Sequence, residues 1–108
     1  MSILGIMQKN TVYIINKNNR ELFVGIYLGD NKFYVLDKLK GYYCADVLNI
    51  EENQLKNIDI IVKSALLISV DKSNIIEIDN VNVYGYKINV SKADIELWIL
   101  KSKLSGVI

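Results

Sequence analysis

Three polar segments of the chain carry side chains that could hold an anion. Each segment combines a cation or hydroxyl with Asn or Asp residues, and such groups attract or hydrogen-bond phosphate oxygens. Asn, Asp and Gly are also the common turn formers, so the same residues predict loop tips between regular elements. The candidate nucleic-acid-binding residues are Lys17, Arg20, Asn31, Lys32, Lys72, Ser73 and Asn74.

Catalytic and metal-binding groups are scarce. The chain has no His and one Cys, which removes the commonest general base and any thiolate cluster. Glu51 with Glu52 favour a solvated turn over an acid/base pair, and Glu77 with Asp79 favour the exposed side of a strand end. There is no Gly-rich phosphate or dinucleotide loop. We therefore expect a non-enzymatic protein without catalytic residues, metal or other cofactor.

The overall charge and apolar content point in different directions. Thirteen Lys and Arg against twelve Asp and Glu leave a net charge of +1, so any anion site must be local. Hydrophobic residues make up 51% of 108 positions, slightly above the roughly 45–50% of soluble domains. Because a chain of this size buries a limited share of its surface, the surplus predicts a homo-oligomer.

The expected location is the cytoplasm. Cys44 cannot form an intrachain disulfide and lies in an apolar stretch, which favours a buried thiol in a reducing compartment. The apolar segment 1–7 is too short and lacks the basic leader of a signal peptide. No uncharged run reaches the ~18 residues of a membrane span, so no membrane partner is expected.

The first half of the chain predicts a β-meander. Residues 11–16 are β-branched and aromatic, residues 21–28 are apolar at every second position, and residues 32–36 return after a Gly-Asp-Asn turn. Gly25 interrupts the second strand, where we expect a sharp bend that leaves no room for a side chain.

The middle of the chain is less regular. Residues 41–50 fit no single element, and residues 51–56 fit either a loop or one helical turn. Apolar runs predict further strands at residues 65–68, 75–78 and 81–90.

A helix is predicted from Lys92, with Ser91 and Asp94 spaced as a capping box and Gly106 placed to end it. A strand over residues 95–100 is the alternative. The helix is apolar on two stripes, which is more than one small domain covers, so one stripe is expected at a subunit interface. The candidate interface residues are Leu97, Trp98, Leu100 and Leu104.

Seven tyrosines permit two interpretations. Aromatic rings on a sheet can stack nucleic-acid bases when cations lie nearby. Aromatic residues are also enriched in strands for packing reasons alone, and this interpretation is favoured for each of them.

The order of elements resembles the Sm-like small β-barrels, the group that includes archaeal Sm-like proteins and bacterial Hfq. The similarity lies in residues 12–36, with Leu-Phe-Val-Gly at 22–25, and in residues 70–78, where a tight loop joins two strands. Asp71 and Lys72 stand where the family has Arg-Gly, and its Asp-x-x-Met-Asn signature is replaced by a short turn. The resemblance therefore does not extend to the family's central-pore uridine site.

The resemblance implies a mainly β fold, a strongly bent Sm-like or SH3-like barrel in a single domain. The barrel is expected over residues 8–80, with a strand and helix added over residues 81–108. The implied function is oligomeric binding of single-stranded RNA or DNA through the loop residues. The alternative is a protein-interaction or assembly module, such as an accessory or inhibitor protein of a mobile element, that binds no nucleic acid.

Overall fold

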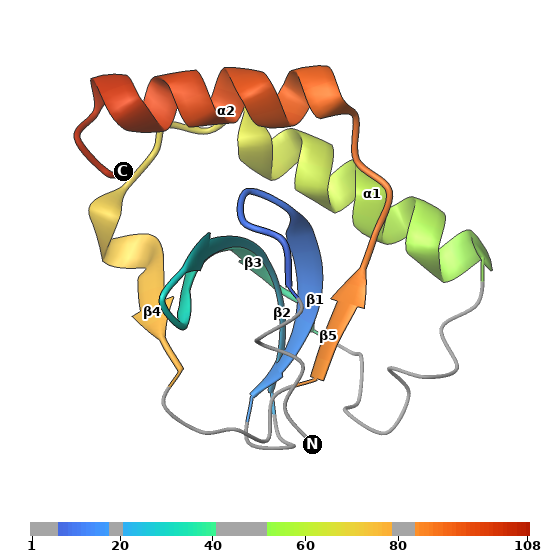
Figure 1. Ribbon diagram of the computed structural model, residues 1–108. Coiled ribbons are helices and arrows are strands. Elements are labelled where there is room, and N and C mark those ends of the chain that lie inside the picture. The colour runs from blue at the N-terminus through green and yellow to red at the C-terminus, as the bar shows by residue number, and fades with distance from the viewer. Residues whose placement is uncertain (1–6, 18–20, 41–51, 79–83) are drawn as a thin grey trace.

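The computed structural model describes residues 7–17, 21–40, 52–78 and 84–108 (Figure 1). Its elements, in chain order, are strands β1 (Val12–Lys17), β2 (Glu21–Gly29) and β3 (Lys32–Lys38), helix α1 (Glu52–Leu66), the 3₁₀ turn η3 (Lys72–Asn74), strands β4 (Ile75–Glu77) and β5 (Tyr84–Lys87), and helix α2 (Lys92–Leu104). Residues 41–50, including Cys44, lie outside the described residues.

The described strands form one antiparallel sheet in the order β4-β3-β2-β1-β5. The predicted β-meander of β1, β2 and β3 is confirmed, and it forms the centre of this sheet. Strand β5 joins β1 in this sheet, so the expected C-terminal addition contributes a strand to the main layer. The expectation of a mainly β barrel needs correction. Two long helices make the fold mixed, and within the described residues β4 and β5 remain unpaired edges of an open sheet.

Gly25 lies at an irregularity that helps to curve the sheet. The register of β2 with β3 shifts between Val24 and Gly25, and both strands bend into an arch (Figure 1). A Cβ atom on Gly25 would lie 2.7 Å from the carbonyl oxygen of Tyr34 and 3.3 Å from Ile15 Cδ1. The prediction that this position has no room for a side chain is confirmed.

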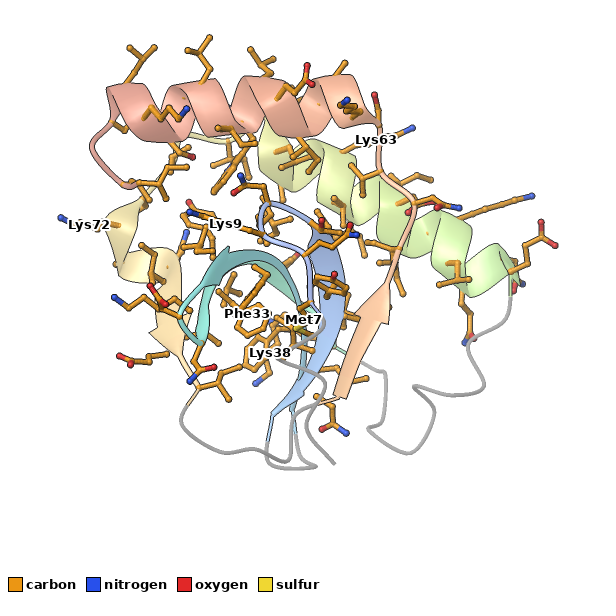
Figure 2. All side chains as sticks on the ribbon, viewed as in Figure 1. Met7, Lys9, Phe33, Lys38, Lys63 and Lys72 are labelled. Carbon is orange, nitrogen blue, oxygen red and sulfur yellow. The ribbon has the colours of Figure 1, made fainter. Side chains whose placement is uncertain are left out.

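Each face of the arched sheet has its own core. The helices cover the convex face, where the buried residues are Val12, Ile14, Leu22, Val24, Ile26, Tyr34, Leu39, Ile58, Val62, Leu66, Ile88 and Trp98. The concave face encloses a smaller cluster, in which Figure 2 shows Phe33 and Met7 beneath the arch. Its buried residues are Tyr13, Ile15, Tyr27, Phe33 and Ile78. Strict alternation along β1 sends neighbouring residues to opposite cores.

Helix α1 replaces the strand predicted at residues 65–68. Ile58, Val62 and Leu66 are buried at intervals of four residues, so packing against the sheet selects a helix despite the β-branched run. Leu67 and Ile68, expected to be buried in that strand, are exposed beyond the end of the helix.

Helix α2 begins at Lys92 as predicted, although no side-chain hydrogen bond from Ser91 caps it. Its position over α1 is fixed in part by Lys101, whose Nζ donates a 2.6 Å hydrogen bond to the carbonyl oxygen of Leu66. This cation therefore satisfies a partly buried carbonyl oxygen at the C-terminal end of α1. Within the part of the chain that the structure describes, neither helix has the length and apolar character to cross a membrane.

Candidate nucleic-acid interface

A groove of about 780 Å³ runs between the C-terminal half of α2 and the end of the sheet formed by the β2–β3 turn and β4. Figure 2 shows two of its lysines, Lys9 and Lys72, both on the side of the molecule where α2 ends. The lining residues are Lys9, Asn10, Leu28, Gly29, Asp30, Lys32, Lys72, Ile75, Glu77, Ile99, Lys103, Val107 and Ile108.

The β2–β3 turn forms one wall because three successive residues adopt left-handed backbone conformations. The φ angles are +88° at Gly29, +52° at Asp30 and +61° at Asn31. Gly and Asn or Asp are the residues that tolerate this region, so the local sequence selects the tight turn. Lys32 then starts β3 directly opposite Glu77 of β4, which sets a cation and a carboxylate side by side at the groove.

The η3 turn holds Lys72 at the groove through two local anchors. The carboxylate of Asp71 accepts a hydrogen bond from the backbone amide of Ser73 at 2.9 Å and caps the turn. The hydroxyl of Tyr34 accepts one from the Asp71 amide at 2.8 Å and one from Asn74 Nδ2 at 3.3 Å. The hydrogen bond from the Ser73 backbone, with a further one from its side chain, lowers the pKa of the Asp71 carboxyl below its ordinary value.

The end of α2 supplies the apolar part of the opposite wall. Gly106 adopts φ +72°, and the Val107 amide donates a 2.9 Å hydrogen bond back to the carbonyl oxygen of Ser102. This left-handed cap reverses the chain after the helix. As a result Val107 joins Ile99 and Lys103 along the groove.

Two of the predicted binding residues line this groove. Lys32 and Lys72, distant in the sequence, are brought together by the pairing of β3 with β4. Ser73 and Asn74 belong to η3, but their polar groups bind Asp71 and Tyr34, and neither residue lines the groove. Asn31 is exposed beside it, and its carbonyl oxygen accepts the Ile78 amide at 2.8 Å.

The other two predicted cations are not part of the groove as described. Lys17 ends β1 opposite Glu21, at the far end of β2 from Gly29, eight strand steps or about 26 Å measured along the strand. Arg20 lies outside the described residues.

Sequence reasoning missed five polar residues of the groove, which are Lys9, Asn10, Asp30, Glu77 and Lys103. Lys9 and Asn10 form a turn before β1, and the same association of cations with turn residues could have identified them. Asn10 has φ +63°, and its buried Oδ1 has no hydrogen-bond partner among the described residues. Lys103 gives no local signal, because only the packing of α2 over the sheet brings it to the groove.

Three of the seven tyrosines are not available for base stacking. Tyr13, Tyr27 and Tyr34 are buried in the two cores, and Tyr34 contacts Trp98 edge-on with ring centroids 5.0 Å apart. The packing interpretation of these three residues is therefore confirmed. The groove offers aliphatic rather than aromatic contact surface.

The four candidate interface residues divide between the two sides of α2. Trp98 is 1% exposed and belongs to the core. The prediction that Trp98 lies at a subunit interface is therefore wrong for this residue. Leu97 and Leu100 are each 53% exposed and Leu104 is 80% exposed, which places these three on the outer side.

Four lysines against two carboxylates leave a local positive surplus in the groove, whereas the whole chain is nearly neutral. Such a site can hold an anionic chain by its charges and contact the attached apolar groups along its aliphatic floor. No protein-family model, curated protein or solved structure matches the chain.

Proposed function

We propose that this protein binds single-stranded nucleic acid, RNA or DNA, in the groove between α2 and the β2–β3 turn. The observation that carries the proposal is the convergence of Lys9, Lys32, Lys72 and Lys103 on one groove in a chain with a net charge of only +1. These four lysines come from four separate segments of the chain. The fold therefore creates a local positive charge that the nearly neutral composition does not indicate.

The groove suits a flexible anionic strand better than a small anion. Leu28, Ile75, Ile99 and Val107 provide an apolar surface beside the lysines, on which sugars or bases can rest. Because none of the described residues that line this groove is aromatic or an arginine, we expect weak binding with little sequence preference.

Titrating a fluorescent single strand of about 12 nucleotides while measuring anisotropy tests the proposal, since single-strand sites span roughly 4–16 nucleotides. At ~50 mM salt electrostatic attraction is strong and binding should be detected. If all four lysines contact phosphates, the slope of log affinity against log salt is about −3, or about −0.7 per contact. Uridine and thymidine strands should bind similarly.

Single substitutions assign the binding to the groove. Lys72→Ala and Lys32→Ala should each weaken binding and reduce the salt slope by about 0.7. Lys56→Ala removes an equally charged, exposed side chain from α1 and is the matched control. If the wild type shows no binding at ~50 mM salt, or Lys56→Ala weakens it as much as Lys72→Ala, the proposal fails.

We further propose that the sheet closes into a barrel in solution and that the protein is related to the Sm-like proteins. The three-stranded meander flanked by β4 and β5 would need only one further pairing, between its two edges, to close. Amide-to-amide contacts between β4 and β5 in solution would support closure, and their absence would favour the open sheet. We place the proposed activity in the cytoplasm, in line with the single cysteine.

A protein-interaction module is the second candidate. The observation that favours it is the exposure of Ile60 and Ile68, which line a shallow apolar hollow with Leu36 between α1 and β3. If the groove variants bind nucleic acid like the wild type while Ile60→Lys abolishes a cellular function, this second candidate gains precedence.

A further inference from the structure

The outer side of α2 carries a regular apolar stripe. Ala93, Leu97, Leu100 and Leu104 follow one another at intervals of four, three and four residues, and all four are exposed. Figure 1 shows α2 at the outside of the molecule, with α1 and the sheet both on its other side. The inner side is occupied separately, by Trp98 and Ser102, so the outer leucines are not needed for the core.

The spacing of this stripe is that of the seam between two packed helices. Intervals of three and four residues place side chains at the a and d positions of a heptad, which insert between residues of a facing helix. With Leu97 at an a position, Glu96 and Lys103 both occupy g positions beside the seam, while Asp94 and Lys101 occupy e positions. We propose that a second copy of this chain packs its α2 antiparallel against this stripe.

Shape favours the antiparallel arrangement. A two-fold axis between Leu97 and Leu100 sets Leu97 against Leu100 of the other copy and Ala93 against Leu104. Leu104 is the most exposed of the three leucines, at 80%. Beside Ala93, a hollow of about 200 Å³ is lined by Leu67, Leu97, Lys63, Leu66 and Asp94, and it can receive this leucine. A parallel pair would instead set the two alanines together and leave both hollows unfilled.

Charge favours the same arrangement. In an antiparallel pair facing g positions meet, so Glu96 of each copy lies near Lys103 of the other. In a parallel pair Glu96 would face Lys101, whose ammonium group is already bound to the carbonyl oxygen of Leu66 in α1. The opposed helix dipoles of an antiparallel pair add to this preference.

The contact area is limited to one face of a 13-residue helix and the adjoining residue Leu67. Such a small interface corresponds to a weak or transient dimer. We therefore expect a monomer–dimer equilibrium with a micromolar dissociation constant. This inference does not rest on nucleic-acid binding, because none of the four stripe residues lines the groove. Lys103 lies beside both the stripe and the groove, so oligonucleotide affinity is not used to judge the Lys103 variant.

Sedimentation equilibrium of the full chain over a range of protein concentrations tests the proposal. Leu100→Lys and Leu104→Lys each remove two leucines per dimer and should raise the dissociation constant by about 100-fold or more. Asn57→Lys adds the same side chain at an exposed position of α1, away from the stripe and from both hollows, and is the control that should dimerise like the wild type. Because both substituted leucines are exposed, we expect the variants to fold like the wild type. Circular dichroism spectra of the variants test this expectation.

The orientation is tested by exchanging charges. Glu96→Lys should weaken the dimer, and the double variant Glu96→Lys/Lys103→Glu should restore it, since only the antiparallel pair joins these two positions. Failure of the double variant to restore the dimer overturns the antiparallel arrangement. A wild type that remains monomeric at ~1 mM, well above micromolar constants, or an Asn57→Lys variant that dissociates like Leu100→Lys, overturns the interface itself.

Discussion

The hydroxyl oxygen of Tyr34, in the middle of β3, lies 2.8 Å from the backbone nitrogen of Asp71 and accepts its hydrogen bond. It also accepts Asn74 Nδ2, so one core side chain holds both ends of the turn that presents Lys72. We predict that Tyr34→Phe keeps the fold but lowers the free energy of unfolding by about 1–2 kcal/mol, measured by urea titration. Oligonucleotide affinity should fall with it, because Lys72 loses its support.

Tyr27→Phe is the matched control for that variant. Tyr27 packs against Phe33 in the concave core, with ring centroids 5.0 Å apart, and lies away from η3. Its substitution should leave oligonucleotide affinity unchanged. Equal losses of affinity in the two variants would mean that the Tyr34 hydroxyl does not position the groove.

Gly25 should tolerate no side chain. Because a Cβ atom would lie 2.7 Å from the backbone oxygen of Tyr34, Gly25→Ala must displace one of the two strands. We expect a loss of about 1–3 kcal/mol in unfolding free energy, and a larger loss for Gly25→Val. Gly106→Ala is a useful comparison, because its left-handed φ costs about 1–2 kcal/mol while the space around it is open. A Gly25→Ala protein as stable as the wild type would contradict the close approach.

The two sides of α2 should respond differently to truncation. Trp98→Ala removes a buried ring from the convex core and should cost about 3–5 kcal/mol of unfolding free energy. Leu97→Ala, one residue earlier but exposed, should change the stability of the monomer by less than about 0.5 kcal/mol. Trp98 is the only tryptophan, so its emission should be blue-shifted and poorly quenched by iodide. Ready quenching would place it on the surface.

Binding in the groove should be insensitive to pH around neutrality. The chain contains no histidine, the one side chain whose ordinary pKa makes it change charge between about pH 5 and 8. Oligonucleotide affinity measured at constant ionic strength should therefore stay constant across this interval. A marked change would require a titrating group that the groove, as described, does not contain.

The stability of η3 should respond to acid instead. The hydrogen bonds from Ser73 hold the folded-state pKa of Asp71 below 3.8. The charged cap therefore contributes fully above the ordinary value, and its contribution is lost as the pH falls through the lower folded-state value. The difference in thermal stability between wild type and Asp71→Asn should be constant at neutral pH and shrink in strong acid. A difference that grows on acidification would contradict this assignment.

The strands could be predicted where alternation and turn residues agree. Residues 21–28 carry an aliphatic residue at every second position and end at a Gly-Asp-Asn turn, so β2 and its hairpin with β3 follow from local rules. Helix α1 could not be predicted in this way. Its run of Ile58, Ile60, Ile61 and Val62 has β propensity, and only the fit of Ile58 and Val62 against the sheet makes it helical.

The candidate site was predictable in part for a similar reason. Lys32 and Lys72 lie at turns that the neighbouring Asn and Asp residues predict. Pairing of β3 with β4 brings those turns together. Lys103 is one of several lysines on helical surfaces, and its role depends on where α2 crosses the sheet. The sequence shows that α2 is apolar on two sides. Only the packed structure shows that Trp98 faces the core and that the three leucines face outward.

Strand β5 protects the edge of β1 with only four residues, and its partner in the sheet is about 70 positions away in the chain. The hairpins β1–β2 and β2–β3 close short loops and are expected to form early in folding, whereas β5 must wait for a long-range encounter. During that interval the edge of β1 is uncovered, and its sequence Val-Tyr-Ile-Ile is rich in β-forming residues without charge. Slow docking of β5 therefore makes β1 the segment through which newly synthesised chains would aggregate.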